Sequence, residues 1–207
     1  MRVDVAEADW RELYHLCIGF VVPRPIALVS SMSENDTPNV APFSFYNMVS
    51  ANPPTVMFCP GLKRDRSSKD TLRNVERTGE FVVATVVDAI AEKMVATAAD
   101  LPYGSSEFPF AGLTPKPASR VRAPLVAESP VNIECVVRKI VRLDDGPGSS
   151  RMVLGTIQVI HVDDGLLTPD KRIDPHKLKA VGRLGGAWYA DVETPYEMQV
   201  PKPPSAE

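Results

Sequence analysis

Two short stretches in the first third of the chain carry residue types that suit a planar ligand with a phosphate. The first, KRDRSSKDT, places Lys63, Arg64 and Arg66 just before serine, lysine and threonine residues at the expected start of a helix. A helix N-terminus presents unpaired backbone N–H groups and the positive end of its dipole, so this arrangement suits a phosphate. A solvated basic loop with an ordinary serine cap is the simpler alternative.

The second stretch, NVAPFSFYN (39–47), alternates aromatic and small polar residues between two asparagines. A planar polar ligand on a strand is held best by backbone groups and short polar side chains beside an apolar wall. Ser44 and Asn47 can hydrogen-bond ring heteroatoms, and Ala41 leaves room for close approach. Pro42 removes a donor where sheet pairing stops. The alternative is an edge strand beside a turn, with Ser44 facing solvent.

Other common catalytic patterns are absent from the sequence. No nucleophile elbow, Walker loop, GxGxxG or HExxH motif occurs, and His15, His161 and His176 are scattered. Each of the three cysteines lies in an apolar segment without CxxC spacing, so we expect reduced core thiols and no metal site. The sequence therefore predicts a binding wall and argues against metal or Ser-His-Asp chemistry.

Composition limits the class of protein and its partners. With 207 residues, of which 44% are hydrophobic, we expect one domain over 1–207, with a core at about 12–190 and a Pro-rich C-terminal tail at 191–207. The 23 basic and 26 acidic residues argue against a nucleic acid or an anionic membrane as the main partner. No leader pattern occurs and no apolar run approaches the ~18 residues of a membrane helix, so we expect a cytoplasmic protein.

The elements that must position these residues are mostly short strands, because β-branched and aromatic runs alternate with clusters of turn-forming residues. We expect strands at residues 25–32, 39–49, 53–60, 80–87, 129–143 and 151–162. The first two flank SENDTP and the last two flank DDGPGSS, so each pair predicts an antiparallel hairpin. The continuous apolar character of 80–87 indicates burial on both faces.

One helix is well marked at both ends. Ser67 or Ser68 can cap its start, Leu72 and Val75 share one face, and Gly79 follows as a stop. The other segments are a helix at 88–99, a long surface excursion at 101–119, and a short helix before a glycine-rich turn at 174–190. Several antiparallel strands with a few helices favour a closed or partly open barrel.

Several stretches, taken in order along nearly the whole chain, resemble the flavin reductase-like family. They are VVPRPIALVSS, NVAPFSFYNMVSANPPTVMF, KDTLRNVERTGEFVV, GLTP, ESPVNIEC, VGRLGG and WYA. The resemblance implies a mainly β protein with a few helices and the antiparallel, Greek-key-like, FMN-binding split β-barrel fold. Members of this family bind FMN in a groove at a homodimer interface, so a homodimer and bound FMN are expected.

The resemblance also assigns candidate residues by position. Candidates for the phosphate and ribityl end are Arg24, Ser30, Ser31, Lys69 and Thr71, and candidates for the ring end are Asn39, Ala41, Pro42, Phe43, Ser44 and Asn47. Arg183 is a lower-ranked candidate for the flavin or the partner subunit, with an exposed arginine in a glycine-rich turn as its alternative. His161 is a candidate contact for the nicotinamide or another substrate, with a structural histidine as its alternative.

The function that the resemblance implies is an NAD(P)H-dependent flavin reductase. Such an enzyme accepts a hydride from NADH or NADPH and passes electrons to free flavin, oxygen or a partner monooxygenase. The flavin does the chemistry and the protein positions it, so no catalytic triad is needed. The alternatives are a flavoredoxin-like FMN electron carrier that takes electrons from another protein, and a relative that has lost the flavin. Because the sequence contains no GxGxxG unit, we expect the nicotinamide to stack on the flavin in a shallow groove.

Overall fold

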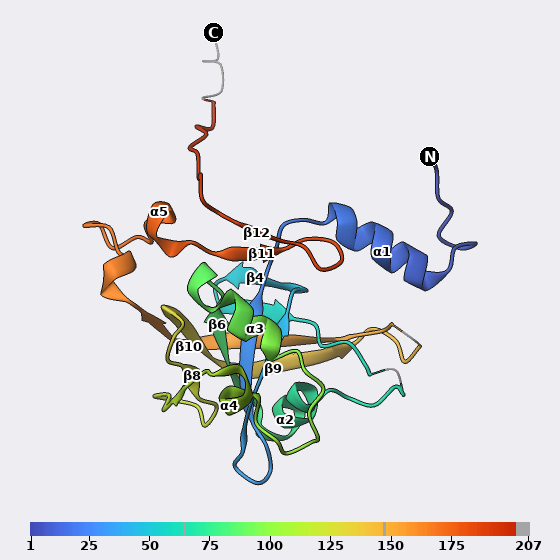
Figure 1. The fold of residues 1–207 in the computed structure, drawn as a ribbon, viewed down its shortest axis with the longest axis horizontal. Helices are drawn as coiled ribbons and strands as arrows, with labels where there is room; N and C mark the ends of the chain where they lie inside the picture. The colour runs from blue at the N-terminus through green and yellow to red at the C-terminus, as the bar shows by residue number, and fades with distance from the viewer. Residues whose placement is uncertain (64, 147, 202–207) are drawn as a thin grey trace.

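The structure, a computed structural model, describes residues 1–63, 65–146 and 148–201, and its main element is one antiparallel sheet (Figure 1). Within these residues the sheet has seven strands in the order β3-β2-β6-β9-β10-β5-β4. In chain order their bounds are Ala27–Met32 (β2), Pro38–Phe43 (β3), Tyr46–Ala51 (β4), Pro54–Phe58 (β5), Glu80–Thr85 (β6), Val131–Arg142 (β9) and Arg151–Val162 (β10). This arrangement agrees with the predicted mainly β, antiparallel class.

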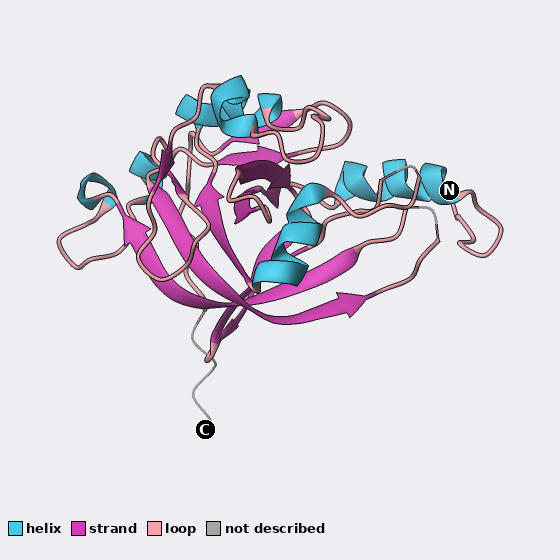
Figure 2. Ribbon diagram, turned by 90° about the horizontal axis from the view of Figure 1, so that it is seen from below, coloured by secondary structure: helices cyan, strands magenta, loops and turns pink. Residues whose placement is uncertain are grey.

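Both predicted hairpins are present, since β2 pairs with β3 and β9 pairs with β10. The prediction of one strand over 39–49 is wrong, because a bend at Ser44 and Phe45 divides this stretch between β3 and β4. These two strands lie at opposite ends of the sheet order. Because only two residues join them, the two edges of the sheet must come close together at the bend, which requires a strongly curved sheet such as Figure 2 shows. The barrel is therefore split at this place.

Two smaller sheets accompany the barrel. Strands β1 (Arg24–Pro25), β11 (Val181–Arg183) and β12 (Tyr189–Asp191) form one, in the order β1-β11-β12. Strands β7 (Pro115–Lys116) and β8 (Leu125–Val126) form the other. The first of these sheets joins the start of the barrel to the C-terminal part of the chain.

The helices of the described residues are short. Their bounds are Trp10–Phe20 (α1), Asp70–Thr78 (α2), Ala91–Ala96 (α3), Glu107–Ala111 (α4) and Pro175–Leu178 (α5), with 3-10 turns at Asp88–Ile90 (η1) and Asp164–Leu166 (η2). None of these described helices is long and apolar enough to cross a membrane. The excursion predicted at 101–119 is thus not wholly irregular, since it contains α4 and β7.

Helix α2 ends as predicted and begins differently. Gly79 follows it in the left-handed conformation, at φ 71°, which glycine adopts without the steric cost of a Cβ atom. The N-cap residue is Lys69, and no side chain of the described residues caps the helix. The predicted capping by Ser67 or Ser68 is therefore wrong. Ser67 instead bonds Asp65 within the preceding loop.

The centre of the barrel is buried on both faces. Leu28 and Ala84 face a hydrophobic cluster that α3 and α4 cover, and both are fully buried. Their neighbours Val29 and Val83 face the barrel interior, into which α2 packs. Successive residues of a strand point to opposite faces, so β2 and β6 need apolar residues at every central position. This confirms the predicted two-sided burial of 80–87.

Helix α1 was not predicted, and it lies beside the barrel rather than within it (Figure 1). Ile18 is its one buried residue. Cys17 is exposed, so the prediction of three core thiols is wrong for this one. Cys135 is buried in the barrel interior, where burial raises the pKa of its thiol to about 12. Cys59 is half-buried.

Candidate functional site

A buried polar network lies where β2, β3 and α2 meet. The side-chain amide of Asn39 donates to the hydroxyl of Thr71 at 3.0 Å and to that of Ser31 at 3.4 Å. The amide of Asn74 donates to the same Ser31 hydroxyl at 3.0 Å. All four side chains are at most 5% exposed. The network therefore fixes the first turn of α2 against the outer strand β3.

A pocket of about 640 Å³ opens directly above this network. Its walls are the edge of β3, the loop and first turn of α2, the turn at 97–101, and Glu107 of α4. Asn39 and Thr71 supply polar groups to the wall, and Ala41 and Pro42 supply apolar surface. Pockets for cofactor-sized ligands measure roughly 300–1,000 Å³ and combine apolar walls with a few polar groups. The size and lining of this pocket suit such a ligand.

The charges around the pocket are mixed. The amine of Lys63 lies 3.4 Å from a carboxylate oxygen of Asp70 and 3.8 Å from one of Asp100. Lys69 is exposed, lines the pocket and stands at the N-cap of α2. The first N–H groups of a helix have no intrahelical acceptor, and here no described side chain caps them. This end of the pocket can therefore receive an anion.

Glu107 was not predicted as a site residue. It is 6% exposed, and its Oε2 accepts the backbone N–H of Val40 at 3.0 Å. Burial raises the pKa of its carboxyl above the usual range, the N–H of Val40 opposes this shift, and the nearby Asp70 adds to it. Glu107 lies in the Pro, Gly and Ser-rich excursion, where no local pattern distinguishes it.

Of the predicted phosphate-end residues, the structure brings Lys69 and Thr71 to the pocket and Ser31 just beneath it. Ser30 lies on the opposite side of β2, where its buried hydroxyl donates to the carbonyl of Pro124. Adjacent residues of a strand point to opposite faces, so Ser30 and Ser31 face different surroundings. Asn74, which was missed, lies on the same helix face as Thr71, three residues later.

Of the predicted ring-end residues, Asn39, Ala41 and Pro42 line the pocket. Phe43 is 6% exposed and packs in the barrel interior against Phe58, with ring centroids 5.2 Å apart. Ser44 lies in the bend after β3. Asn47 is exposed on β4, and its side-chain oxygen accepts the N–H of Met48. The last three therefore lie outside this pocket.

Arg24 and Arg183 are neighbours in another part of the fold, where their strands pair. Arg24 is 7% exposed and donates to the carbonyls of Ile18 and Val21 at 2.9 and 2.6 Å, and to that of Leu184 at 2.8 Å. It thus joins the end of α1 to the turn after β11. Arg183 donates to the hydroxyl of Tyr189 and to the carbonyl of Gly186.

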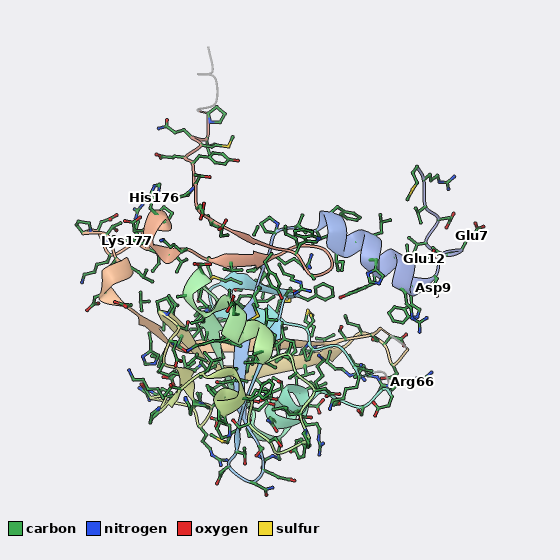
Figure 3. The ribbon with its side chains drawn as sticks, viewed as in Figure 1. Glu7, Asp9, Glu12, Arg66, His176 and Lys177 are labelled. Carbon is green, nitrogen blue, oxygen red and sulfur yellow. The ribbon has the colours of Figure 1, made fainter. Side chains whose placement is uncertain are left out.

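His161 lies away from this pocket, near the end of β10. Its Nε2 is 2.6 Å from Oε1 of Glu134, a fully buried carboxylate. The ring lines a second pocket of about 540 Å³, together with Lys116, Glu128 and Asp163. The basic stretch at 63–66 is only partly described, because Arg64 lies outside the described residues. Figure 3 shows Arg66 at the outer end of that loop.

Comparisons with known proteins show the family and the fold of this chain. The family model described as "Flavin reductase like domain" matches residues 19–175. An uncharacterized protein of Aquifex aeolicus is 39% identical over 189 residues, which cover 91% of this chain and 94% of that protein. Another, from Halalkalibacterium halodurans, is 36% identical and covers 97% of each chain.

A solved structure with a very similar fold is nitrilotriacetate monooxygenase component B from Bacillus cereus. It has a TM-score of 0.90 and 32% sequence identity, and the match covers 96% of this chain and 98% of that one. The Pseudomonas fluorescens 2-nitrobenzoate 2-nitroreductase NbaA has a TM-score of 0.87 and 28% identity over the full length of both chains. Together with the matched family model, these similarities confirm the split-barrel fold.

Proposed function

Since this chain belongs to the flavin reductase-like family, we propose that it is an FMN-binding flavoprotein that acts as an NAD(P)H-dependent flavin reductase. The observation that carries the proposal is the pocket beside β3, where Asn39, Thr71 and Lys69 meet at the open N-terminus of α2. This arrangement combines an apolar wall, hydroxyl and amide groups, and a cationic end in one place.

The lining fits FMN part by part. Lys69, the Thr71 hydroxyl and the first N–H groups of α2 would hold the phosphate, as charge-assisted bonds from a cation and a helix N-terminus favour an anion. Asn39, Ala41 and Pro42 would lie against the ring and the ribityl chain. The Lys63 amine is paired with carboxylates, so it offsets their charge rather than adding to the phosphate site. We therefore propose FMN as the resident flavin.

When bound, the flavin would supply the redox chemistry, in which a hydride comes from NADH or NADPH and electrons pass to an acceptor. The chain's own part is to bind and orient the ring and to limit the access of water. Similarity to a monooxygenase component B supports a partner monooxygenase that receives the electrons or the reduced flavin. His161 remains a proposed contact for a substrate in its separate pocket.

We also propose a homodimer. Helix α1, the bend after β3 and strand β4 carry exposed apolar side chains, which we call the α1–β4 face: Trp10, Tyr14, Leu16, Phe20, Phe45, Met48 and Val49, each at least 40% exposed. The rings of Tyr14 and Phe45 lie 6.5 Å apart, which joins its two halves. Large exposed apolar patches mark interaction sites, and a second copy of the chain would cover this one by two-fold symmetry.

The test is anaerobic stopped-flow mixing of the FMN-loaded protein with NADH and, separately, with NADPH. Rapid bleaching of the flavin absorbance by either nucleotide is the expected result. Bleaching by neither, with FMN still bound, would instead favour an electron carrier that is reduced by another protein. A purified protein that is colourless and binds no added FMN would overturn both.

A further inference from the structure

Strand β3 is an outer strand of the barrel sheet, with β2 on one side only. Its backbone groups on the other side must find partners elsewhere, because the ladder offers none. Alternate residues of a strand direct their N–H groups to the same side, and the N–H of Val40 points away from β2 to Glu107. The two neighbouring positions on that side are Pro38 and Pro42, and proline has no N–H. Between these prolines, the Val40 N–H is thus the one outward donor of the strand.

Glu107 accepts this single donor. The distance is 3.0 Å, and both residues are buried, with Glu107 6% and Val40 0% exposed. The Val40 side chain belongs to the same hydrophobic cluster as Phe108 of α4. One turn of α4 therefore holds the centre of β3 by packing and by one charged hydrogen bond. A buried N–H that loses its acceptor destabilises the position it occupies.

The residues on either side of Val40 belong to the flavin pocket. Asn39 and Ala41 both line it, and Asn39 also bonds Thr71 at 3.0 Å. We propose that Glu107 is a positioning residue for the flavin site, which holds β3 through the Val40 N–H and so fixes Asn39 and Ala41 at the pocket wall. This inference rests on the proposed function, because it concerns how tightly that same site binds its ligand.

Two substitutions separate the hydrogen bond from the charge. Glu107→Gln keeps an acceptor for the Val40 N–H and removes the charge, whereas Glu107→Leu keeps the volume and removes the acceptor. A control is Glu80→Leu, because Oε1 of Glu80 accepts the Arg122 N–H at 2.8 Å, and Glu80 lines neither the flavin pocket nor the pocket of His161. Glu107→Asp, with a shorter side chain, serves in place of Glu107→Leu should that variant not fold.

The experiment measures the dissociation constants of FMN and riboflavin and the hydrogen exchange of the Val40 amide. E107L should weaken the binding of both flavins by about tenfold, because Asn39 and Ala41 would contact the ring and ribityl chain, which both flavins share. It should also speed hydrogen exchange at the Val40 amide, which loses its acceptor. E107Q should bind both flavins within about threefold of the parent and keep Val40 protected. E80L should lower the melting temperature without changing either constant.

The outcomes distinguish the inference from the proposed function. E107L could show faster hydrogen exchange at the Val40 amide and a lower melting temperature, yet bind both flavins as the parent does. Glu107 would then have a structural role only, and the inference would be wrong. It is also wrong if E107Q weakens flavin binding as much as E107L does, because the hydrogen bond is then not what matters. A parent protein that binds neither flavin overturns the proposed function itself, and with it the site that Glu107 would serve.

Discussion

The buried carboxylate of Glu134 lies 2.6 Å from Nε2 of His161 and also accepts three consecutive backbone N–H groups. These come from Ser119, Arg120 and Val121, at 2.8, 2.6 and 3.2 Å. One side chain of β9 thus binds the long excursion after α4 to the barrel and orients the imidazole at the end of β10. The carboxylate is the common acceptor of all four groups.

We expect Glu134→Ala to lower the free energy of unfolding by at least about 1–3 kcal/mol, because it leaves buried N–H groups without an acceptor. Urea unfolding followed by circular dichroism measures this. His161→Ala removes only one of the four donors and should cost less. Equal losses in the two variants would show that the backbone contacts do not stabilise the excursion.

The contribution of Glu134 should also depend on pH. Burial alone would raise the pKa of its carboxyl, but the hydrogen bonds from His161 and the three N–H groups outweigh burial and hold the pKa below its usual range. A depressed pKa stabilises the folded state fully above the ordinary glutamate pKa of about 4.3, and the contribution is lost as the pH falls through the folded value. The difference in unfolding free energy between the parent and Glu134→Ala should therefore shrink below that pH.

Lys69→Ala should weaken FMN binding by about tenfold to a hundredfold, which corresponds to the roughly 1.5–3 kcal/mol of a charged hydrogen bond. Riboflavin, which lacks the phosphate, should bind as before. Fluorescence titration with both flavins makes the comparison. Arg66→Ala is the control, because Arg66 belongs to the same loop but does not line the pocket. A selective loss of FMN in Arg66→Ala, with Lys69→Ala unchanged, would move the phosphate site to the loop.

Charged substitutions on the α1–β4 face should dissociate the proposed dimer. The free-energy cost of burying an unpaired charge is much larger than the free energy gained by burying the apolar side chain that it replaces. The double variant Phe20→Asp, Met48→Asp should therefore show a monomer mass by light scattering at micromolar concentration. Ile160→Asp is the control, because Ile160 is 55% exposed, close to the 54% of Met48, on the distant end of β10. A double variant that stays dimeric would place the interface elsewhere.

Gly155→Ala should destabilise the barrel by about 1–3 kcal/mol through overpacking. A Cβ atom at this position would lie 2.7 Å from Cε1 of Phe81 and 3.2 Å from Cβ of Cys135, and both side chains are fully buried. Gly61→Ala is the matched control, since its nearest contact would be 3.9 Å away. Thermal unfolding of the two variants tests the difference, and equal melting temperatures would contradict it.

The cysteines should differ in reactivity without affecting redox chemistry. Exposed Cys17 should be alkylated first in the native protein, because the thiolate is the reactive form and access controls its rate. Cys135 should stay unmodified until the protein unfolds, since burial raises its pKa to about 12. Mass spectrometry after timed alkylation measures both. Loss of flavin reduction on alkylation, with FMN still bound, would require a catalytic thiol.

Sequence patterns predicted the parts of the fold that depend on local chemistry. Gly79 ends α2 because the position after the helix takes the left-handed backbone conformation, which glycine adopts readily. The continuous apolar sequence of β6 matches the burial of that strand on both faces. The bend at Ser44 and Phe45 was not predictable, because alternation continues through it and only the curling of the sheet separates the two strands. Helix α1 was missed because its apolar residues are largely exposed.

The candidate site was predictable where residues adjacent in sequence stay adjacent in space, as in the first turn of α2. Ser30 and Ser31 look equivalent in the sequence, and only the register of β2 with β3 assigns them to different faces. Glu107 reaches the pocket from a segment 67 residues after Val40, so its role follows from tertiary packing alone. The same holds for Arg24, whose partners are carbonyls that no side-chain pattern reveals.

The split in the barrel also bears on the order in which the chain folds. Strands β9 and β10 are neighbours along the chain, so their hairpin closes a short loop and loses little conformational entropy. Strand β5 pairs with β10 across about a hundred residues, as at Thr55 and Thr156, and β4 joins the sheet only through β5. We therefore expect β5, and β4 with it, to pair with β10 late in folding. The barrel should then close around the bend at Ser44 and Phe45 late and slowly.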